Sequence, residues 1–269
     1  MIIKLAQRVL LLIAIVSVSV KGQEKNNAPY TLSRDLDMKI AVISGGLLLG
    51  SMLIDYTPMD LSEIAGLKPG DVPDYDSRAI DNWNVGSIKM SDVLLFSSIA
   101  VPGLLMFDQE IRSDYRNFSL VWAQSLFLTL GFTNFTKVLV GRPRPYLYAD
   151  NASDNYKLKK DNRKSFFSGH TSVSAVSWFL MASMYEDYRP GSNISPYLWT
   201  SAFLVPAYTA YCRYDAGKHF LSDVVAGYLV GSTIGVLVPK WYTKKNNKVN
   251  LSFILQPTGK IKTRLTYEF

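Results

Sequence analysis

The chain has 269 residues, of which 48% are hydrophobic and 19% are charged, and this composition excludes a globally disordered protein. Its net charge of +7 favours an anionic partner, which can be a phosphate ester, an anionic lipid head group or nucleic acid. The single cysteine excludes an intrachain disulfide, so the cysteine content does not indicate a cellular compartment.

Residues 1–22 have the pattern of a secretory signal peptide. Lys4 and Arg8 precede an apolar run over residues 9–20, and small residues follow that run. An uncleaved N-terminal anchor has the same pattern. In both cases we expect the chain to enter the export route.

Six further apolar segments predict the helices of the main domain, residues 23–240. They cover residues 38–54, 91–107, 119–136, 171–185, 196–211 and 222–238. Most are shorter than the roughly 20 residues of a comfortable membrane span, but their Ser, Thr, Gly and Tyr residues suit the packing of membrane helices. Because the mean hydropathy is only +0.07, a buried soluble core fits these segments as well. The polar loops 55–90 and 137–170 lower this average, so we predict an all-α, six-helix bundle embedded in a membrane.

The remaining polar segments have two different patterns. The loop 55–90 is acidic and rich in Pro, Gly and Asp, which predicts a cap with turns. In the C-terminal tail, residues 241–269, the stretches VNLSFIL and KIKTRLTYEF alternate polar and apolar residues around PTG. This alternation predicts a short β-hairpin.

Lys137 and Arg144 lie seven residues apart at the end of an apolar segment. Basic side chains at such a position often reach lipid phosphates at the membrane surface. Pro143 and Pro145 favour a more specific role, because prolines stiffen the chain and fix the direction of the Arg144 side chain.

Ser168, Gly169 and His170 lie at the start of the next apolar helix. A Ser-Gly pair at a helix start offers backbone N–H groups and a hydroxyl to an anion, which the helix dipole also favours. His170 fits two roles at this point, a hydrogen-bonded capping residue or a group that transfers a proton.

His219 and Asp223 lie four residues apart, so on a helix they share one face and can form a hydrogen bond. A carboxylate that binds one ring nitrogen fixes the tautomer of a histidine and leaves the other nitrogen free as a nucleophile. Arg213, six residues upstream of His219, can place its guanidinium on the same anion. An aspartate at a helix start is often an ordinary cap, and Asp223 fits that role too.

The chain has only two histidines, and both lie beside basic residues at the edges of apolar helices. Phosphoryl transfer needs positive charge around three oxygens, an in-line nucleophile and an acid for the leaving group. Lys137, Arg144 and Arg213 can supply the charge. His219 can act as the nucleophile and His170 as the acid.

The spacing of these residues resembles three motifs of the type 2 phosphatidic acid phosphatase superfamily, K-x6-RP, PSGH and SR-x5-H-x3-D. The matching stretches of this chain are Lys137-x6-Arg144-Pro145, Phe167-Ser168-Gly169-His170 and Cys212-Arg213-x5-His219-x3-Asp223. Phe167 and Cys212 depart from the motifs, which usually have Pro and Ser at these positions. We expect a reshaped turn before Ser168 and the loss of one hydroxyl donor, with the principal groups intact.

The resemblance implies a six-helix membrane phosphatase that hydrolyses phosphoric monoesters or diphosphates without a metal ion or another cofactor. His219 would attack phosphorus to form a phosphohistidine, Asp223 would orient its ring, and His170 would protonate the leaving oxygen. The phosphoryl oxygens would be bound by Lys137, Arg144, Ser168, Gly169 and Arg213. The substrate would be a phosphorylated lipid, such as a polyprenyl diphosphate, phosphatidylglycerol phosphate, phosphatidic acid or lipid A, and no nucleic acid partner is expected.

Other functions fit the sequence less well. A cysteine phosphatase needs Cys-x5-Arg, and the chain has Lys218 at that offset from Cys212. A transporter explains the apolar helices but not the three motifs. Vanadium haloperoxidases share the same oxyanion pocket, with vanadate in place of phosphate, and halide oxidation with added vanadate distinguishes them. A soluble secreted acid phosphatase is the main alternative, and membrane fractionation distinguishes it.

The basic residues between the apolar segments indicate an orientation in a bacterial inner membrane. Arg112 and Arg116 follow the second segment, Arg189 follows the fourth, and Lys240, Lys244, Lys245 and Lys248 follow the sixth. The positive-inside rule makes these parts cytoplasmic, which places the three motifs on the periplasmic face of the cell envelope. A cleaved signal peptide followed by six crossings would invert this orientation, so the prediction requires that either 9–20 or 38–54 does not cross.

Overall fold

The computed structural model describes residues 28–54, 56–149, 152–243, 249–255 and 261–267. The predicted signal peptide or anchor, residues 1–22, lies outside the described residues. The described part is mostly helical, and each of the six predicted apolar segments coincides with a long helix. These are α2 (Arg34–Leu53), α5 (Val85–Ala100) with the 3-10 helix η2 (Val101–Phe107), α7 (Tyr115–Val140), α9 (Gly169–Tyr188), α10 (Ser195–Asp215) and α11 (Leu221–Tyr242).

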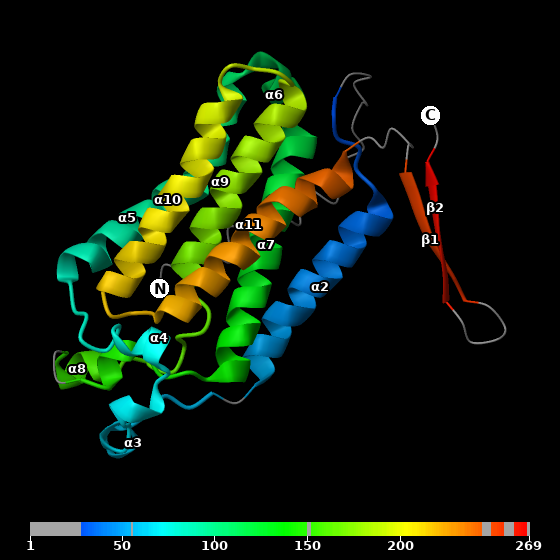
Figure 1. Ribbon diagram of the computed structural model, residues 1–269. Helices are drawn as coiled ribbons and strands as arrows, with labels where there is room; N and C mark the ends of the chain where they lie inside the picture. Colours follow the sequence, from blue (N-terminus) through cyan, green and yellow to red (C-terminus); the bar gives the residue numbers. More distant parts are fainter. Residues whose placement is uncertain (1–27, 55, 150–151, 244–248, 256–260, 268–269) are drawn as a thin grey trace.

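α9 is the central helix of the bundle. It packs against α5, α7, α10 and α11, as Figure 1 shows. Most of its side chains are buried, and Val176, Leu180 and Met184 belong to the largest apolar core cluster. α2 packs against α7 at the periphery, and within α2 only Ile40 and Ser44 are buried.

α9 and α11 approach each other closely along three glycines of α11. A Cβ atom added at Gly227, Gly231 or Gly235 would lie 2.6, 2.2 or 2.7 Å from a backbone oxygen of the α9 segment. Glycines four residues apart let two membrane helices touch through their backbones. The contact holds the start of α11 firmly against the start of α9.

We expect Gly231→Ala to destabilise the fold, because the new methyl group would meet the Ser172 carbonyl oxygen at 2.2 Å and force the two helices apart. The loss should be about 1–3 kcal/mol, the usual range for overpacking a tight contact. Thermal unfolding in detergent measures this loss. Gly46→Ala is the matched control, since a Cβ atom there meets nothing within 4 Å, and an equal Tm for the two variants would contradict the expectation.

Short elements close both ends of the bundle. α3 (Leu61–Ala65), α4 (Asp74–Ser77) and α8 (Asp154–Lys157) lie at one end, and α6 (Gln109–Ser113) lies at the other (Figure 1). The 3-10 helices η1 (Pro69–Asp71) and η3 (Pro145–Leu147) belong to the same loops as α4 and α8. The predicted loop 55–90 is shorter than expected, since α5 begins at Val85. The Asn84 side chain starts this helix by accepting from the Ser87 N–H (3.2 Å).

α7 ends at a glycine in the left-handed conformation. Gly141 has φ 58°, and its N–H donates to the Lys137 carbonyl (3.1 Å). Glycine adopts this conformation without strain, which makes it the usual helix terminator. The turn leads the following residues across the end of the bundle, where the Arg144 N–H donates to the Asn162 carbonyl (3.0 Å).

Three of the long helical segments have the length and composition of membrane spans. They are α2, the continuous segment Val85–Phe107 and α11. Each exposes large apolar side chains, for example Leu49, Phe96 and Leu229. This supports the predicted membrane protein, while the crossing of all six helices stays a prediction.

The C-terminal tail contains two paired strands. β1 (Val249–Leu255) and β2 (Ile261–Tyr267) are antiparallel, with Val249 opposite Tyr267. The PTG turn expected between them lies outside the described residues, so the complete hairpin stays a prediction.

Candidate active site

The three motif stretches meet at the end of the bundle that carries α3, α4 and α8. α7 and α10 end there, and α9 and α11 begin there (Figure 1). The predicted site residues come from these helix ends and from the loops between them. They are Lys137, Arg144, Ser168, Gly169, His170, Arg213, His219 and Asp223.

His219 lies in the loop between α10 and α11, and only 1% of its surface is exposed. Its Nδ1 is 2.8 Å from the Ser165 carbonyl oxygen, which can only accept, so Nδ1 carries the proton. Nε2 is therefore unprotonated, and Nη1 of Arg144 lies 3.4 Å from it. Burial lowers the pKa of His219 well below its usual value, and the charges of Arg144 and Lys137 lower it further. The ring is thus neutral at pH 7, with the lone pair that a nucleophile needs.

Asp223 is not hydrogen-bonded to His219, so that part of the prediction is wrong. His219 precedes α11 and does not lie on it, and 3.6 Å separate its Nδ1 from Oδ2 of Asp223. This oxygen accepts from the Ser165 hydroxyl (2.5 Å) and from the Phe220 N–H (2.9 Å). Asp223 orients His219 through Ser165, whose hydroxyl binds the carboxylate and whose carbonyl binds the ring.

Arg142 holds the other oxygen of Asp223, and it was not among the predicted site residues. Its Nη1 is 2.7 Å from Oδ1 of Asp223, and its Nη2 is 2.7 Å from Oδ2 of Asp76 in α4. Asp76 also accepts from the backbone N–H (2.9 Å) and the hydroxyl (2.6 Å) of Ser222. The Arg142 guanidinium lies 4.0 Å from the centroid of the Phe220 ring. The cap is thereby tied to the Asp223 carboxylate, which binds Ser165.

Lys137, Arg144 and Arg213 form a buried basic cluster, with exposed fractions of 9%, 5% and 5%. Arg144 donates to the Asp161 carboxylate (2.8 Å) and to the Lys218 carbonyl (3.0 Å). These two contacts fix the guanidinium beside Nε2 of His219. In the described part of the chain, no three His, Cys, Asp or Glu side chains are grouped so that they could hold a metal ion.

Two members of the basic cluster retain hydrogen-bonding capacity. Lys137 donates to the Lys164 carbonyl (2.6 Å), which leaves two of its ammonium hydrogens for other acceptors. Arg213 donates to the Ser91 hydroxyl (3.2 Å), and its buried Nε has no hydrogen-bond partner among the described residues. A buried guanidinium N–H without an acceptor is destabilising, and a bound anion would supply that acceptor.

Ser168 and Gly169 shape the start of α9. The Ser168 hydroxyl caps the helix by accepting from the Thr171 N–H (3.4 Å) and hydroxyl (2.9 Å). A Cβ atom at position 169 would lie 3.7 Å from Cε of Lys137 and 3.2 Å from a methyl carbon of Thr133. The glycine therefore lets Lys137 pass close to a helix N-terminus, whose N–H groups favour an anion.

His170 is paired with a carboxylate from α5. Its Nε2 is 2.8 Å from Oδ1 of Asp92, and the same oxygen is 4.0 Å from Nη1 of Arg213. Asp92 was not predicted, although an ionisable residue within an apolar helix is a recognised signal of a functional site. A carboxylate that holds a histidine ring orients it for proton transfer, so this pair suits a general acid at the border of the basic cluster.

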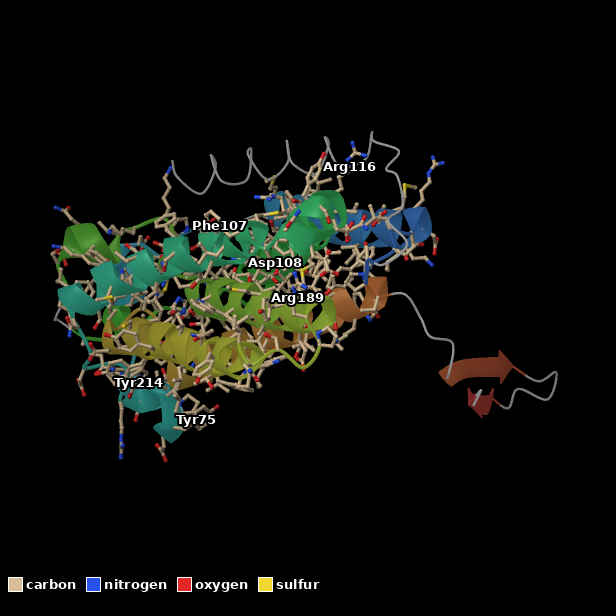
Figure 2. All side chains as sticks on the ribbon, turned by 90° about the horizontal axis from the view of Figure 1, so that it is seen from above. Tyr75, Phe107, Asp108, Arg116, Arg189 and Tyr214 are labelled. Atoms are coloured by element: carbon tan, nitrogen blue, oxygen red, sulfur yellow. The ribbon has the colours of Figure 1, made fainter. Side chains whose placement is uncertain are left out.

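An apolar groove of about 890 Å³ lies near this end of the bundle, between α4, α10 and α11. Its lining includes Tyr75, Tyr214, Leu221 and Val225, and Figure 2 shows Tyr75 and Tyr214 at the same edge of the molecule. Tyr214 and Leu221 flank the chain segment that carries His219.

We expect Cys212→Ser to retain or exceed the wild-type rate of phosphate release. The thiol is buried, with 1% of the residue exposed, and the site described above makes no use of it. Serine is the usual residue at this position of the SR-x5-H-x3-D motif. Complete loss of phosphate release in this variant would contradict the assignment and indicate thiol chemistry.

The family model described as the PAP2 superfamily matches residues 119–247, which contain all eight predicted site residues. Residues 119–247 of the chain are therefore similar to the PAP2 superfamily. The match confirms the resemblance of the three motifs to type 2 phosphatidic acid phosphatases. Asp76 and Asp92 lie outside the stretch matched by the PAP2 model.

The PAP2 match agrees with the names of similar proteins. They include a PA-phosphatase related-family protein of Dictyostelium discoideum, 30% identical over 156 residues, and phospholipid phosphatase 1 of Rattus norvegicus, 28% identical over 134 residues. The two alignments cover 54% and 41% of this chain, and 58% and 47% of the relatives, so each spans about half of the related protein. No solved structure matches the chain significantly.

Proposed function

We propose that this protein is a membrane phosphatase that hydrolyses a lipid phosphate or diphosphate through a phosphohistidine on His219, without a metal ion. The observation that carries the proposal is the unprotonated Nε2 of His219 beside the buried guanidinium of Arg144. A neutral, fixed imidazole next to buried cations is the arrangement that nucleophilic attack on a phosphoryl group needs.

The proposed reaction has two steps. In the first, Nε2 of His219 attacks phosphorus, the bond from phosphorus to the ester oxygen breaks, and this oxygen takes a proton from His170. In the second, water gives a proton back to His170 and attacks the phosphohistidine, which releases inorganic phosphate. Lys137, Arg144 and Arg213 stabilise the negative charge on the phosphoryl oxygens in both steps.

A lipid substrate is supported by the apolar surroundings of the site. α11, which carries Asp223 in its first turn, is one of the three segments with the length and composition of a membrane span. The groove between α4, α10 and α11 is lined mainly by apolar and aromatic side chains and borders the chain segment of His219. A hydrocarbon chain in this groove would keep its phosphate near the basic cluster.

Phosphate release by the purified protein tests the proposal. Phosphatidic acid, phosphatidylglycerol phosphate, a polyprenyl diphosphate and lipid A should be offered in detergent micelles, with and without EDTA. We expect release from at least one of them at a rate that EDTA does not change. Loss of activity with EDTA would contradict the metal-independent reaction. Recovery of the protein in the soluble fraction of a cell lysate would contradict the membrane location and favour a secreted acid phosphatase.

We propose further that the site faces the periplasm of a bacterial cell envelope. Arg112, Arg189 and Lys240 belong to the end of the bundle opposite the site, as the positive-inside rule requires. α2 begins at that same opposite end, where the Thr31 N–H donates to the Tyr242 carbonyl (2.8 Å). Residue 28 would then be cytoplasmic. This orientation therefore requires that residues 1–22 do not cross the membrane.

Cysteine accessibility tests this orientation in a Cys212→Ser background. Ser153 at the site end and Asn193 at the opposite end are both exposed. We expect a membrane-impermeant maleimide to label Ser153→Cys in intact spheroplasts and to label Asn193→Cys only after lysis. The reverse pattern would place the active site in the cytoplasm.

A further inference from the structure

Lys218, the residue before His219, is a buried cation outside the basic cluster. Only 6% of its surface is exposed. Its ammonium lies 3.6 Å from the ring centroid of Tyr156, 4.7 Å from that of Tyr146 and 5.7 Å from that of Trp83. We call these three rings the aromatic cage. Among the described residues, no carboxylate or other acceptor binds the Lys218 ammonium.

The aromatic cage is assembled from three separate parts of the chain. Trp83 follows α4, Tyr146 lies in η3 and Tyr156 lies in α8. The rings contact one another edge to face, with centroids 4.7 Å apart for Trp83 and Tyr156 and 5.3 Å apart for Tyr146 and Tyr156. Such rings attract a cation without neutralising its charge, so the Lys218 ammonium stays available to an anion.

The hydroxyl of Tyr146, in the aromatic cage, is a second polar group that retains hydrogen-bonding capacity. The residue is fully buried, and its hydroxyl has no hydrogen-bond partner among the described residues. Native proteins rarely bury a hydroxyl without a partner, which indicates a missing ligand. The backbone N–H of Tyr146 donates to the Gly217 carbonyl (3.2 Å), so the loop of Arg144 and the loop of His219 run side by side here.

The Lys218 carbonyl accepts from Arg144 (3.0 Å), so Lys218 borders the basic cluster. Burial and the charge of Arg144 lower the pKa of Lys218 to about 6, although the charge of Asp92 acts in the opposite direction. Asp92 is the carboxylate that holds His170, the proposed acid for the leaving oxygen. An anion near Lys218 would raise this pKa again and so favour the charged ammonium at pH 7.

We infer that Lys218 and Tyr146 form a second anion subsite, which binds the inner phosphoryl group of a diphosphate ester. The inference rests on the proposed function and narrows its substrate class to lipids that carry two linked phosphoryl groups. Lys218 contributes a positive charge and Tyr146 a hydroxyl donor to the phosphoryl group that leaves with the lipid.

The reaction on a diphosphate balances with the groups already described. His219 Nε2 bonds to the terminal phosphorus, and the bond from this phosphorus to the bridging oxygen breaks. The bridging oxygen takes the proton of His170, and the lipid monophosphate leaves. Water then hydrolyses the phosphohistidine to inorganic phosphate. Lys218 stabilises the charge that develops on the departing phosphoryl group.

Farnesyl diphosphate and farnesyl monophosphate in the same detergent micelles test the subsite, because they share one tail and differ by one phosphoryl group. The readout is the ratio of kcat/KM for the diphosphate to kcat/KM for the monophosphate. We expect this ratio to fall about 10-fold in Lys218→Met, as the loss of one charge-assisted contact predicts. Tyr146→Phe keeps the ring and should lower the ratio in the same direction.

Lys159→Met is the matched control. Lys159 is exposed, and its ammonium is also 3.6 Å from the Tyr156 ring centroid, so this variant removes a lysine from the same ring without touching the subsite. Its ratio should equal that of the wild type. An unchanged ratio in both Lys218→Met and Tyr146→Phe would overturn the second subsite. Failure of the wild type to hydrolyse farnesyl diphosphate would also overturn the second subsite, and failure on every lipid phosphate offered would contradict the proposed function itself.

Discussion

His219→Ala is expected to lower the rate of phosphate release from a lipid phosphate by at least about 10⁴-fold, since it removes the attacking atom. The basic cluster would still bind the phosphoryl group, because Arg144 is held by Asp161 and by a backbone carbonyl, neither of which depends on the imidazole. KM should therefore change far less than kcat. Steady-state kinetics on phosphatidic acid measure both constants.

The fold of His219→Ala has to be checked, because the imidazole is buried and binds the Ser165 carbonyl. Its thermal unfolding in detergent should resemble that of Asp223→Asn, a variant that keeps the side-chain size and the nucleophile. We expect Asp223→Asn to retain partial activity, since Asp223 acts on the ring through Ser165. A wild-type rate in a folded His219→Ala protein would refute the phosphohistidine mechanism.

His170→Ala is expected to lower the rate on phosphatidic acid by about 10²–10⁴-fold, the usual contribution of a general acid. The loss should be much smaller on p-nitrophenyl phosphate, because p-nitrophenolate is a stable anion and leaves without a proton. Comparing the two substrates thus separates proton transfer from phosphate binding. Equal losses on both would contradict the acid role.

Asp92→Asn complements this test. The amide keeps the contact with the His170 ring but removes the negative charge beside it. We expect a shifted pH profile of kcat on phosphatidic acid and a smaller loss than for His170→Ala. Asp35→Asn is a suitable control, because Asp35 is an exposed carboxylate near the opposite end of the bundle.

The helices of the bundle could be predicted because their apolar residues repeat along the chain itself. The residues of the site that share a short motif were also predictable, since His219, Arg213 and Asp223 are linked by fixed spacing. Their partners were not. Ser165 is an ordinary polar residue in a loop and Asp76 one in the short helix α4, and only the folded chain brings them to the Asp223 segment.

His219 and Asp223 show why the spacing of two residues in the sequence is not enough to predict a hydrogen bond between them. Residues four apart face each other only where both lie on one helix. α11 begins at Leu221, and at its start the Asp223 carboxylate accepts from the Phe220 N–H. His219 therefore lies in the preceding loop and not on the helix that carries Asp223. The aspartate thus caps the helix, and in the proposed mechanism it also orients the nucleophile through Ser165.

The glycine contact between α9 and α11 determines which parts of the site can move independently. A Cβ atom at Gly227 would lie 2.6 Å from the Ser168 carbonyl oxygen, next to His170, and Gly227 itself is four residues after Asp223. The backbones around Ser168 and Asp223 are therefore held in register, so in the proposed mechanism a substrate has to fit a fixed spacing between these two segments.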